Sequence, residues 1–175
     1  MSAAAIDDVL ARVDQDLPQS LERLYQLLRI PSISTDPAYA QECQRAADWL
    51  VADLEELGFA AAAQPTPGHP IVVAHGPDQP GTHVLFYGHY DVQPVDPLHL
   101  WHSDPFEPQL VTDGNGRQII VGRGASDDKG QLMTFVEACR AWKAATGSLP
   151  LRISLMLEGE EESGGKNLPA FMKAN

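Results

Sequence analysis

The sequence predicts one α/β domain in which a mostly parallel or mixed sheet is flanked by helices. Near the N-terminus, apolar residues recur at three- and four-residue steps, which is typical of an amphipathic helix. Short apolar runs at residues 71–74 and 83–87, separated by a turn-rich segment, predict strands. The order strand, helix, strand at residues 118–121, 129–145 and 151–157 predicts two parallel strands joined by a right-handed crossover.

The first predicted helix occupies residues 6–30, and a second follows after a short turn. Pro18 is expected to break or kink the first helix, because proline removes a backbone donor and clashes with the preceding turn. Asp36 and Pro37 form a favourable start for the second helix. That helix should continue to about Leu57 and end at the glycine that comes next.

Residues 94–108 are predicted to form a loop, which contains four prolines and the aromatic side chains Trp101 and Phe106. Loops of this kind often line a site. Apart from a short alanine run at residues 60–63, the sequence has no low-complexity tract, and it has no internal repeat or obvious linker. Its 175 residues suffice for one packed domain and give no case for two.

Composition and charge exclude several kinds of partner. Twenty-four acidic against twelve basic residues give a formal charge of -12, which disfavours nucleic acid and anionic membrane because both would repel such a surface. The N-terminus lacks the features of a signal peptide, and no apolar run is long enough to span a bilayer, so the expected compartment is the cytoplasm. Cys43 and Cys139 are expected to be buried apolar side chains rather than ligands or a disulfide.

Three polar clusters each follow an apolar run. They are Gly-His-Tyr-Asp-Val-Gln-Pro at 88–94, Gly-Arg-Gly-Ala-Ser-Asp-Asp-Lys-Gly at 122–130, and Glu-Gly-Glu-Glu-Glu-Ser-Gly-Gly at 158–165. In open α/β sheets, ligands gather beyond the carboxyl ends of the strands, so we expect the three clusters to converge. An imidazole together with several carboxylates makes a metal site the best interpretation.

Each cluster taken singly also has a structural explanation. His89 and Asp91 alone are a weak signal, since most histidines are simply hydrogen-bonded. Ser126 or Asp127 could cap the helix that follows them. The acids at 160–162 could form a solvated loop, although three adjacent carboxylates repel one another. Four further histidines belong to no motif and are expected in loops or on the surface: His69, His75, His99 and His102.

Taken together and in this order, the motifs resemble those of the dinuclear zinc metallopeptidases and amidohydrolases that include acetylornithine deacetylase, succinyl-diaminopimelate desuccinylase, glutamate carboxypeptidase and carnosinase-type dipeptidases. The runs Leu-Arg-Ile-Pro-Ser-Ile-Ser at 28–34 and Trp-His-Ser-Asp-Pro-Phe at 101–106 are most similar to the dipeptidase branch. The resemblance implies that residues 1–175 are the N-terminal part of the family's catalytic domain. The domain would be incomplete, and the lid domain through which the family forms homodimers would be absent.

The resemblance also implies a role for each candidate site residue. His89 resembles the imidazole ligand of one metal, and Asp91 resembles the carboxylate that orients its ring. Asp127 resembles the carboxylate that bridges two metals. Glu162 resembles the ligand of the second metal, and Glu161 resembles the general base.

The implied reaction is metal-assisted hydrolysis of an amide or peptide bond in a small peptide or an N-acyl amino acid. A zinc-activated water would lose its proton to Glu161. Two zinc ions are implied, with cobalt or manganese as possible replacements. Asp128 would then serve the helix start, and Glu160 would not be a ligand.

The family pattern also requires a further carboxylate ligand and a final histidine ligand downstream of Glu162, and residues 163–175 contain no Asp, Glu or His. The isolated chain is therefore expected to bind metal poorly and to be a truncated, inactive form. Two alternatives are a non-catalytic fragment that associates with another polypeptide through an uncovered sheet edge, and a dinuclear phosphoesterase. The phosphoesterase lacks support from a second histidine motif.

Overall fold

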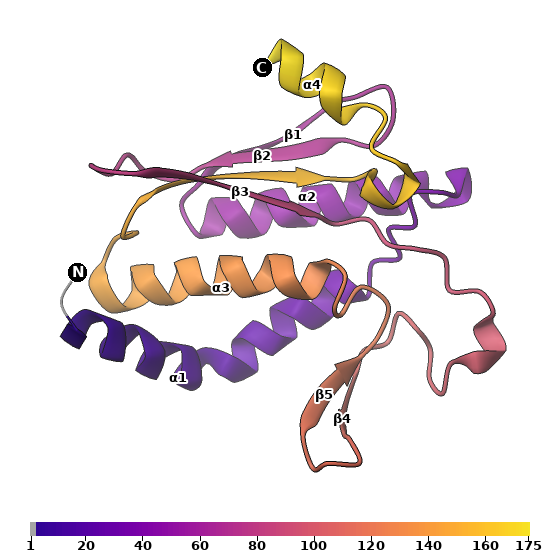
Figure 1. The fold of residues 1–175 in the computed structure, drawn as a ribbon, viewed down its shortest axis with the longest axis horizontal. Coiled ribbons are helices and arrows are strands. Elements are labelled where there is room, and N and C mark those ends of the chain that lie inside the picture. The colour runs from indigo at the N-terminus through magenta and orange to yellow at the C-terminus, as the bar shows by residue number, and fades with distance from the viewer. Residues whose placement is uncertain (1–2) are drawn as a thin grey trace.

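The computed structural model describes residues 3–175 and has a layered α/β arrangement (Figure 1). The longer helices are α1 (Ala3–Leu28), α2 (Ala40–Glu56), α3 (Lys129–Thr146) and α4 (Leu168–Ala174). Short 3-10 helices are η1 (Pro37–Tyr39), η2 (Leu98–Leu100) and η3 (Glu161–Ser163). The strands are β1 (Ala60–Gln64), β2 (Ile71–His75), β3 (His83–His89), β4 (Gln109–Thr112), β5 (Gln118–Val121) and β6 (Arg152–Glu158).

The main sheet has the strand order β1-β2-β6-β3 and is mixed. β2 pairs antiparallel with both β1 and β6, whereas β3 and β6 are parallel. In the β3–β6 pair, His89 lies opposite Glu158, so both strands end at the same edge. The predicted α/β class with a mixed sheet is confirmed.

The predicted pairing of residues 118–121 with 151–157 is wrong. β5 instead pairs antiparallel with β4, in a hairpin that projects away from the body of the molecule (Figure 1). The hairpin turn is closed by Asp113, whose Oδ1 accepts hydrogen bonds from the backbone N–H groups of Asn115 and Arg117 at 2.8 and 2.9 Å. Since the chain turns back locally here, the parallel partner of β6 is β3.

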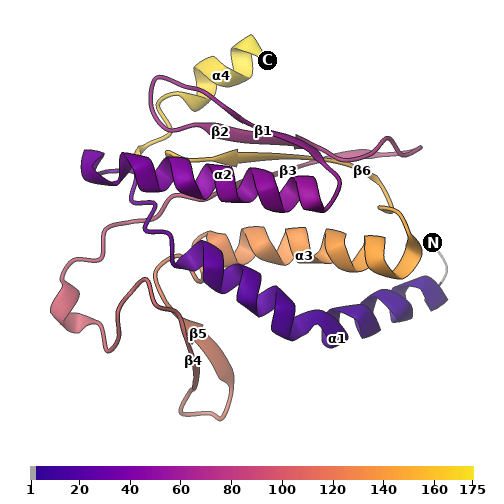
Figure 2. The ribbon, with the colours of Figure 1, turned by 180° about the vertical axis from the view of Figure 1, so that it is seen from behind.

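Both predicted helices near the N-terminus form. α1 continues through Pro18 to Leu28, so the proline does not end the helix, although the ribbon bends along its course (Figure 2). Asp36 starts the second helical segment, because its Oδ1 accepts a hydrogen bond from the Ala38 N–H at 2.9 Å. Gly58, with φ +92°, ends it, as predicted.

The alanine run at residues 60–63 forms most of β1, which the sequence did not predict because alanine is a poor strand former. Pairing with β2 holds the run extended, and Ala61 and Ala63 pack against the core. Here a tertiary contact overrides local propensity.

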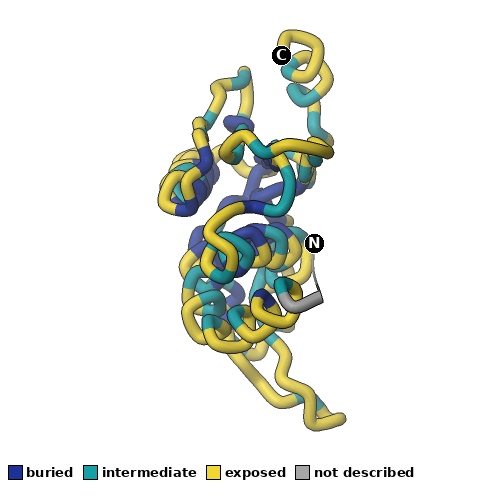
Figure 3. The backbone as a smooth tube through the Cα atoms, turned by 90° about the vertical axis from the view of Figure 1, so that its left-hand side faces the viewer, coloured by how far each residue is buried: buried dark blue, intermediate teal, exposed yellow. Residues whose placement is uncertain are grey.

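One hydrophobic core lies between the main sheet and the helices α2 and α3, which cover the same face (Figures 1 and 2). Phe86 of β3 stacks on Phe135 of α3 with 4.1 Å between ring centroids. The buried residues form a band through the middle of the molecule (Figure 3). On the opposite face of β3, Leu85 and Tyr87 are 58% and 44% exposed.

Cys43 and Cys139 are buried and unpaired, as predicted. Burial raises the pKa of each thiol to about 12, so both remain protonated. None of the helices between residues 3 and 175 is long and apolar enough to cross a lipid bilayer.

Candidate metal and catalytic site

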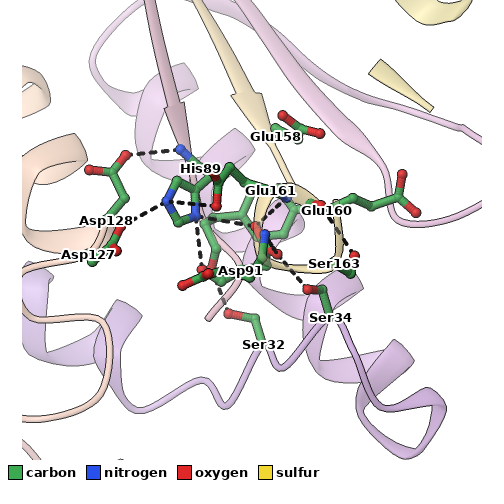
Figure 4. A network of polar contacts seen from close by, with 12 residues as sticks. Ser32, Ser34, His89, Asp91, Asp127, Asp128, Glu158, Glu160, Glu161 and Ser163 are labelled. Carbon is green, nitrogen blue, oxygen red and sulfur yellow. Dashed lines mark hydrogen bonds and ion pairs between the residues drawn. The ribbon is translucent and has the colours of Figure 1, made fainter. Parts of the chain in front are cut away.

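The candidate site lies at the edge where β3 and β6 end. His89 is the last residue of β3, and the acidic loop that contains η3 follows directly after β6. The segment before α3 approaches from the side of the helical layer and brings Asp127 and Asp128 to His89 (Figure 4). The three clusters therefore converge as predicted, although the second one follows the separate β4–β5 hairpin rather than a strand of the main sheet.

The His89 imidazole is the centre of the site. Its Nε2 lies 3.0 Å from Oδ1 of Asp127 and 3.8 Å from Oε2 of Glu161. The imidazole is 8% exposed, whereas the side chains of Asp127 and Glu161 are 73% and 47% exposed. A buried imidazole thus faces two solvent-accessible carboxylates.

Asp91 is the most enclosed acid of the site, with a side chain that is 0% exposed. Its Oδ1 lies 3.3 Å from Nδ1 of His89 and accepts a hydrogen bond from the Glu161 N–H at 3.2 Å. Its Oδ2 accepts hydrogen bonds from the Glu162 N–H at 3.0 Å and from Oγ of Ser34 at 2.5 Å. A buried carboxylate with this many donors is fixed in place, and it joins β3 to the acidic loop.

The protonation of His89 reflects this acidic environment. Burial alone would lower the pKa of the imidazole, but hydrogen bonding and attraction to Asp91 outweigh it, with smaller contributions from Asp128 and Asp127. The net effect raises the pKa of His89 to about 9. The imidazole therefore lies where positive charge is strongly favoured.

Asp128 does not cap α3, contrary to the expectation that it serves the helix start. It occupies the N-cap position, but its side chain makes no capping hydrogen bond. Its Oδ2 instead accepts a hydrogen bond from the backbone N–H of His89 at 3.0 Å. The carboxylate therefore fixes the end of β3 against the start of α3.

Lys129 is a structural residue of the site that the sequence did not reveal. It is 0% exposed, and its Nζ donates hydrogen bonds to the backbone oxygens of Leu27 and Ile30 at 3.0 and 2.7 Å. Burial lowers the pKa of Lys129 to about 7. These hydrogen bonds hold the second motif to the end of α1. The only sequence feature that pointed to Lys129 was its place directly after Asp127 and Asp128.

Glu162 is not brought to the other predicted ligands. Its Oε2 accepts a hydrogen bond from Nε2 of Gln93 at 2.7 Å. Within residues 3–175, no three His, Cys, Asp or Glu side chains come close enough together to hold a metal ion. The arrangement thus brings together two of the predicted ligands, His89 and Asp127, with Glu161 nearby.

Two further acids of the third cluster have structural partners. Glu160 accepts hydrogen bonds from the His69 N–H at 3.3 Å and from Nδ2 of Asn167 at 2.7 Å. Glu158 is 2% exposed, and its Oε2 accepts a hydrogen bond from the Tyr87 hydroxyl at 2.6 Å. Burial raises the pKa of Glu158, and its Oε1 has no hydrogen-bond partner in the described part of the chain.

His69 also takes part in the site, although it has no motif context. Its Nε2 lies 3.1 Å from the backbone oxygen of Ser34, to which it can donate a hydrogen bond. The other histidines without motif context lie elsewhere: His75 contacts the hydroxyl of Ser154, and His99 and His102 are exposed.

The loop at residues 94–108 lies beside the second motif. Nη2 of Arg123 donates a hydrogen bond to the backbone oxygen of Pro94 at 2.9 Å, and its guanidinium lies 5.3 Å from the centre of the Trp101 ring. Nε1 of Trp101 donates to the backbone oxygen of Val95 at 3.0 Å. The loop is therefore anchored by the arginine of the second motif.

Comparison with known proteins gives consistent matches. The sequence profile of Peptidase family M20/M25/M40 matches residues 85–174. The Cys-Gly metallodipeptidase dug1 of Schizosaccharomyces pombe is 32% identical over 97% of this chain and 37% of its own length. The human Beta-Ala-His dipeptidase is 31% identical over 97% of this chain and 35% of its own length.

A solved structure of the dipeptidase Dug1p from Saccharomyces cerevisiae superposes with a TM-score of 0.85 at 31% identity. It covers 99% of this chain, which corresponds to 38% of that protein. The chain thus spans little more than a third of the length of these relatives.

Proposed function

Because the chain belongs to Peptidase family M20/M25/M40, we propose that it carries part of the active site of a metal-dependent, dipeptidase-like hydrolase of peptide or amide bonds. The observation that supports this most is the approach of Nε2 of His89 to Oδ1 of Asp127 at 3.0 Å, with Glu161 beside them. In this proposal residues 1–175 form part of a larger catalytic domain. Homodimerisation through a lid domain and a cytoplasmic location remain predictions.

The family implies a divalent metal, and the donor chemistry fits one. An imidazole nitrogen and a carboxylate oxygen that face each other are ligands suited to zinc, cobalt or manganese. In the proposal, His89 and Asp127 would hold one ion. Asp127 and Glu162 would serve a second ion, for which Glu162 would have to leave its hydrogen bond with Gln93. When bound, the metal would lower the pKa of a water molecule and stabilise negative charge on the substrate carbonyl.

The protein groups around the metal would orient ligands and move the proton. Nδ1 of His89 faces the Asp91 carboxylate and backbone oxygen, at 3.3 and 3.1 Å. With its proton on Nδ1, the ring presents the Nε2 lone pair toward Asp127. Glu161 is exposed and 3.8 Å from Nε2, so it would take the proton of the attacking water and pass it to the leaving amine.

The substrate class follows from the relatives, which are named for Cys-Gly and Beta-Ala-His. We propose a small peptide or N-acyl amino acid for this protein as well. Loop 94–108, anchored by Arg123, would form one wall beside the site.

Metal binding tests the proposal on the chain itself. Cobalt(II) titrated into the 175-residue chain should produce a weak, saturable visible absorption that His89→Ala and Asp127→Asn abolish. His99→Ala, which changes an exposed histidine in η2, should leave the absorption unchanged. Binding that is insensitive to His89 and Asp127 would contradict the proposed site.

Hydrolysis requires the remaining ligands, so it should be assayed in a chimera. Residues 1–175 would be joined to the part of the Schizosaccharomyces pombe relative that lies outside the matched region. A folded chimera should hydrolyse Cys-Gly with added zinc or manganese and leave p-nitrophenyl phosphate intact. The reverse preference would favour a phosphoesterase.

The second candidate function is association with another polypeptide, and the edge strand β3 favours it. β3 has a strand partner on one side only, and its residues Leu85 and Tyr87 are largely exposed. A mass above that of a monomer in light scattering would support association, and a strictly monomeric chain would exclude self-association.

A further inference from the structure

Ser34 lies in a short segment that runs alongside the end of the first motif. Ile33 forms a parallel bridge with Val92, and the Val92 N–H donates a hydrogen bond to the backbone oxygen of Ser32 at 2.9 Å. The segment is buried, with Ser32 at 0% and Ser34 at 9% exposed. The segment therefore packs against the end of the first motif, with both serines largely shielded from solvent.

The two serine hydroxyls of this segment have different partners. Oγ of Ser32 donates to the backbone oxygen of Tyr90 at 2.7 Å, a bond that holds the segment to the strand end. Oγ of Ser34 donates to Oδ2 of the Asp91 carboxylate at 2.5 Å. A hydrogen bond from a hydroxyl to a charged, fully buried carboxylate is among the stronger kinds.

Ser34 is also linked to the acidic loop indirectly, through His69. Its backbone oxygen accepts from Nε2 of His69, and the His69 N–H donates to Glu160. The hydroxyl of Ser34 meets the same Oδ2 atom of Asp91 that the Glu162 N–H contacts. Ser34 is thus bonded to Asp91 of the first motif (Figure 4) and is linked through His69 to Glu160 of the third.

We propose that Ser34 is a positioning residue for the metal site: its hydroxyl fixes the Asp91 carboxylate, which in turn fixes the His89 ring with Nε2 directed at Asp127. This inference rests on the proposed metal site. Without the hydroxyl, Oδ2 of Asp91 retains one backbone donor, and rotation of the carboxylate moves Oδ1 away from Nδ1 of His89. Loss of such a supporting contact typically weakens metal binding about 10- to 100-fold.

The test compares Ser34→Ala with Ser32→Ala, which removes another buried hydroxyl from the same segment. The first readout is exchange of the His89 Nδ1 proton, followed by imidazole NMR of the full chain in EDTA. Ser34→Ala should accelerate this exchange about 10-fold, the effect of one lost hydrogen bond. Ser32→Ala should leave it close to the original rate, and Ser34→Thr, which keeps a hydroxyl, should restore it.

The second readout is cobalt(II) affinity, which should fall about 10-fold or more in Ser34→Ala and little in Ser32→Ala. Equal effects of the two alanine variants, or unchanged exchange in Ser34→Ala, would overturn the proposal. If Ser34→Ala does not fold, the isosteric pair Ser34→Thr and Ser34→Val gives the same comparison. A chain that binds no cobalt would refute the metal site, while the exchange measurement would still decide the role of Ser34 in fixing His89.

Discussion

The carboxylate of Asp128 accepts a hydrogen bond from the backbone N–H of His89, so the residue beside one proposed ligand holds the main chain of the other. The contact joins two residues that lie 39 positions apart in the sequence. The contact also accounts for the glycine at position 88, because a Cβ added there would lie only 3.0 Å from Oδ2 of Asp128.

Asp128→Ala should therefore destabilise the fold and weaken metal binding, because it leaves the His89 N–H without its acceptor. A lost acceptor for a largely buried N–H costs about 1–3 kcal/mol in the free energy of unfolding. Asp128→Asn keeps an acceptor oxygen and should retain most of that energy. Urea unfolding of the three proteins measures the difference, and equal stability of the alanine and asparagine variants would show that the bond contributes little.

Lys129 should give the metal-free chain a distinct pH dependence. Its pKa is lowered from 10.5 to about 7 by burial, so between these values the unfolded chain binds more protons than the folded chain. Stability contributed by this group therefore rises as pH increases from about 7 toward 10.5 and is lowest below pH 7. Lys129→Met should remove that rise.

Urea midpoints measured at several pH values in EDTA would show whether the slope depends on Lys129. The same variant should lose stability at all pH values, since the backbone oxygens of Leu27 and Ile30 lose their donor. If the rise of stability with pH is unchanged in Lys129→Met, the rise must come from another titratable group.

Gly130 should tolerate no side chain. A Cβ there would lie 1.9 Å from the backbone oxygen of Ala125, so the turn of the second motif would have to open. Gly130→Ala should destabilise the chain by about 1–3 kcal/mol, the usual cost of overpacking. Gly114→Ala is the control, because its Cβ would meet nothing within 4 Å. Thermal unfolding of both variants would measure the difference in stability. Equal stability of the two variants would show that the turn adjusts to the added Cβ.

Variants of the adjacent residues Glu160 and Glu161 should distinguish a catalytic role from a structural role in the active chimera. Glu161→Gln removes the proposed base and should lower kcat about 100- to 10,000-fold. Glu160→Gln keeps one of the two acceptor oxygens that His69 and Asn167 contact, removes no group of the proposed reaction and should change kcat little. Steady-state kinetics with Cys-Gly gives both values. Comparable losses in the two variants would mean that Glu161 is not the base.

The sequence predicted the elements whose signals are local. The α1 and α2 helices follow from apolar periodicity, and the start of the second helical segment follows from the side chain of Asp36. The β3–β6 pairing did not follow, because a parallel pairing depends on what lies between the strands, and here α3 and a whole hairpin intervene. β1 is extended only because β2 pairs with it.

The convergence of His89 with Asp127 was predicted from polar motifs that directly follow apolar runs, but the supporting contacts were not predicted. Ser34, Lys129 and His69 each contact a carboxylate or a backbone oxygen 35 or more positions away in the sequence. No spacing in the sequence reports such a contact, since it depends on how three separate segments pack.

The β4–β5 hairpin joins the rest of the chain at a narrow base, where the Arg123 N–H donates to the backbone oxygen of Pro105 at 2.8 Å. Every residue of β4 is exposed, and β5 is at most half-buried. Because the base is pinned and the tip carries little of the packing, we expect changes of length and sequence in this hairpin to leave the rest of the fold intact. The surroundings of the site could therefore be altered here without disturbing the residues proposed to bind and react.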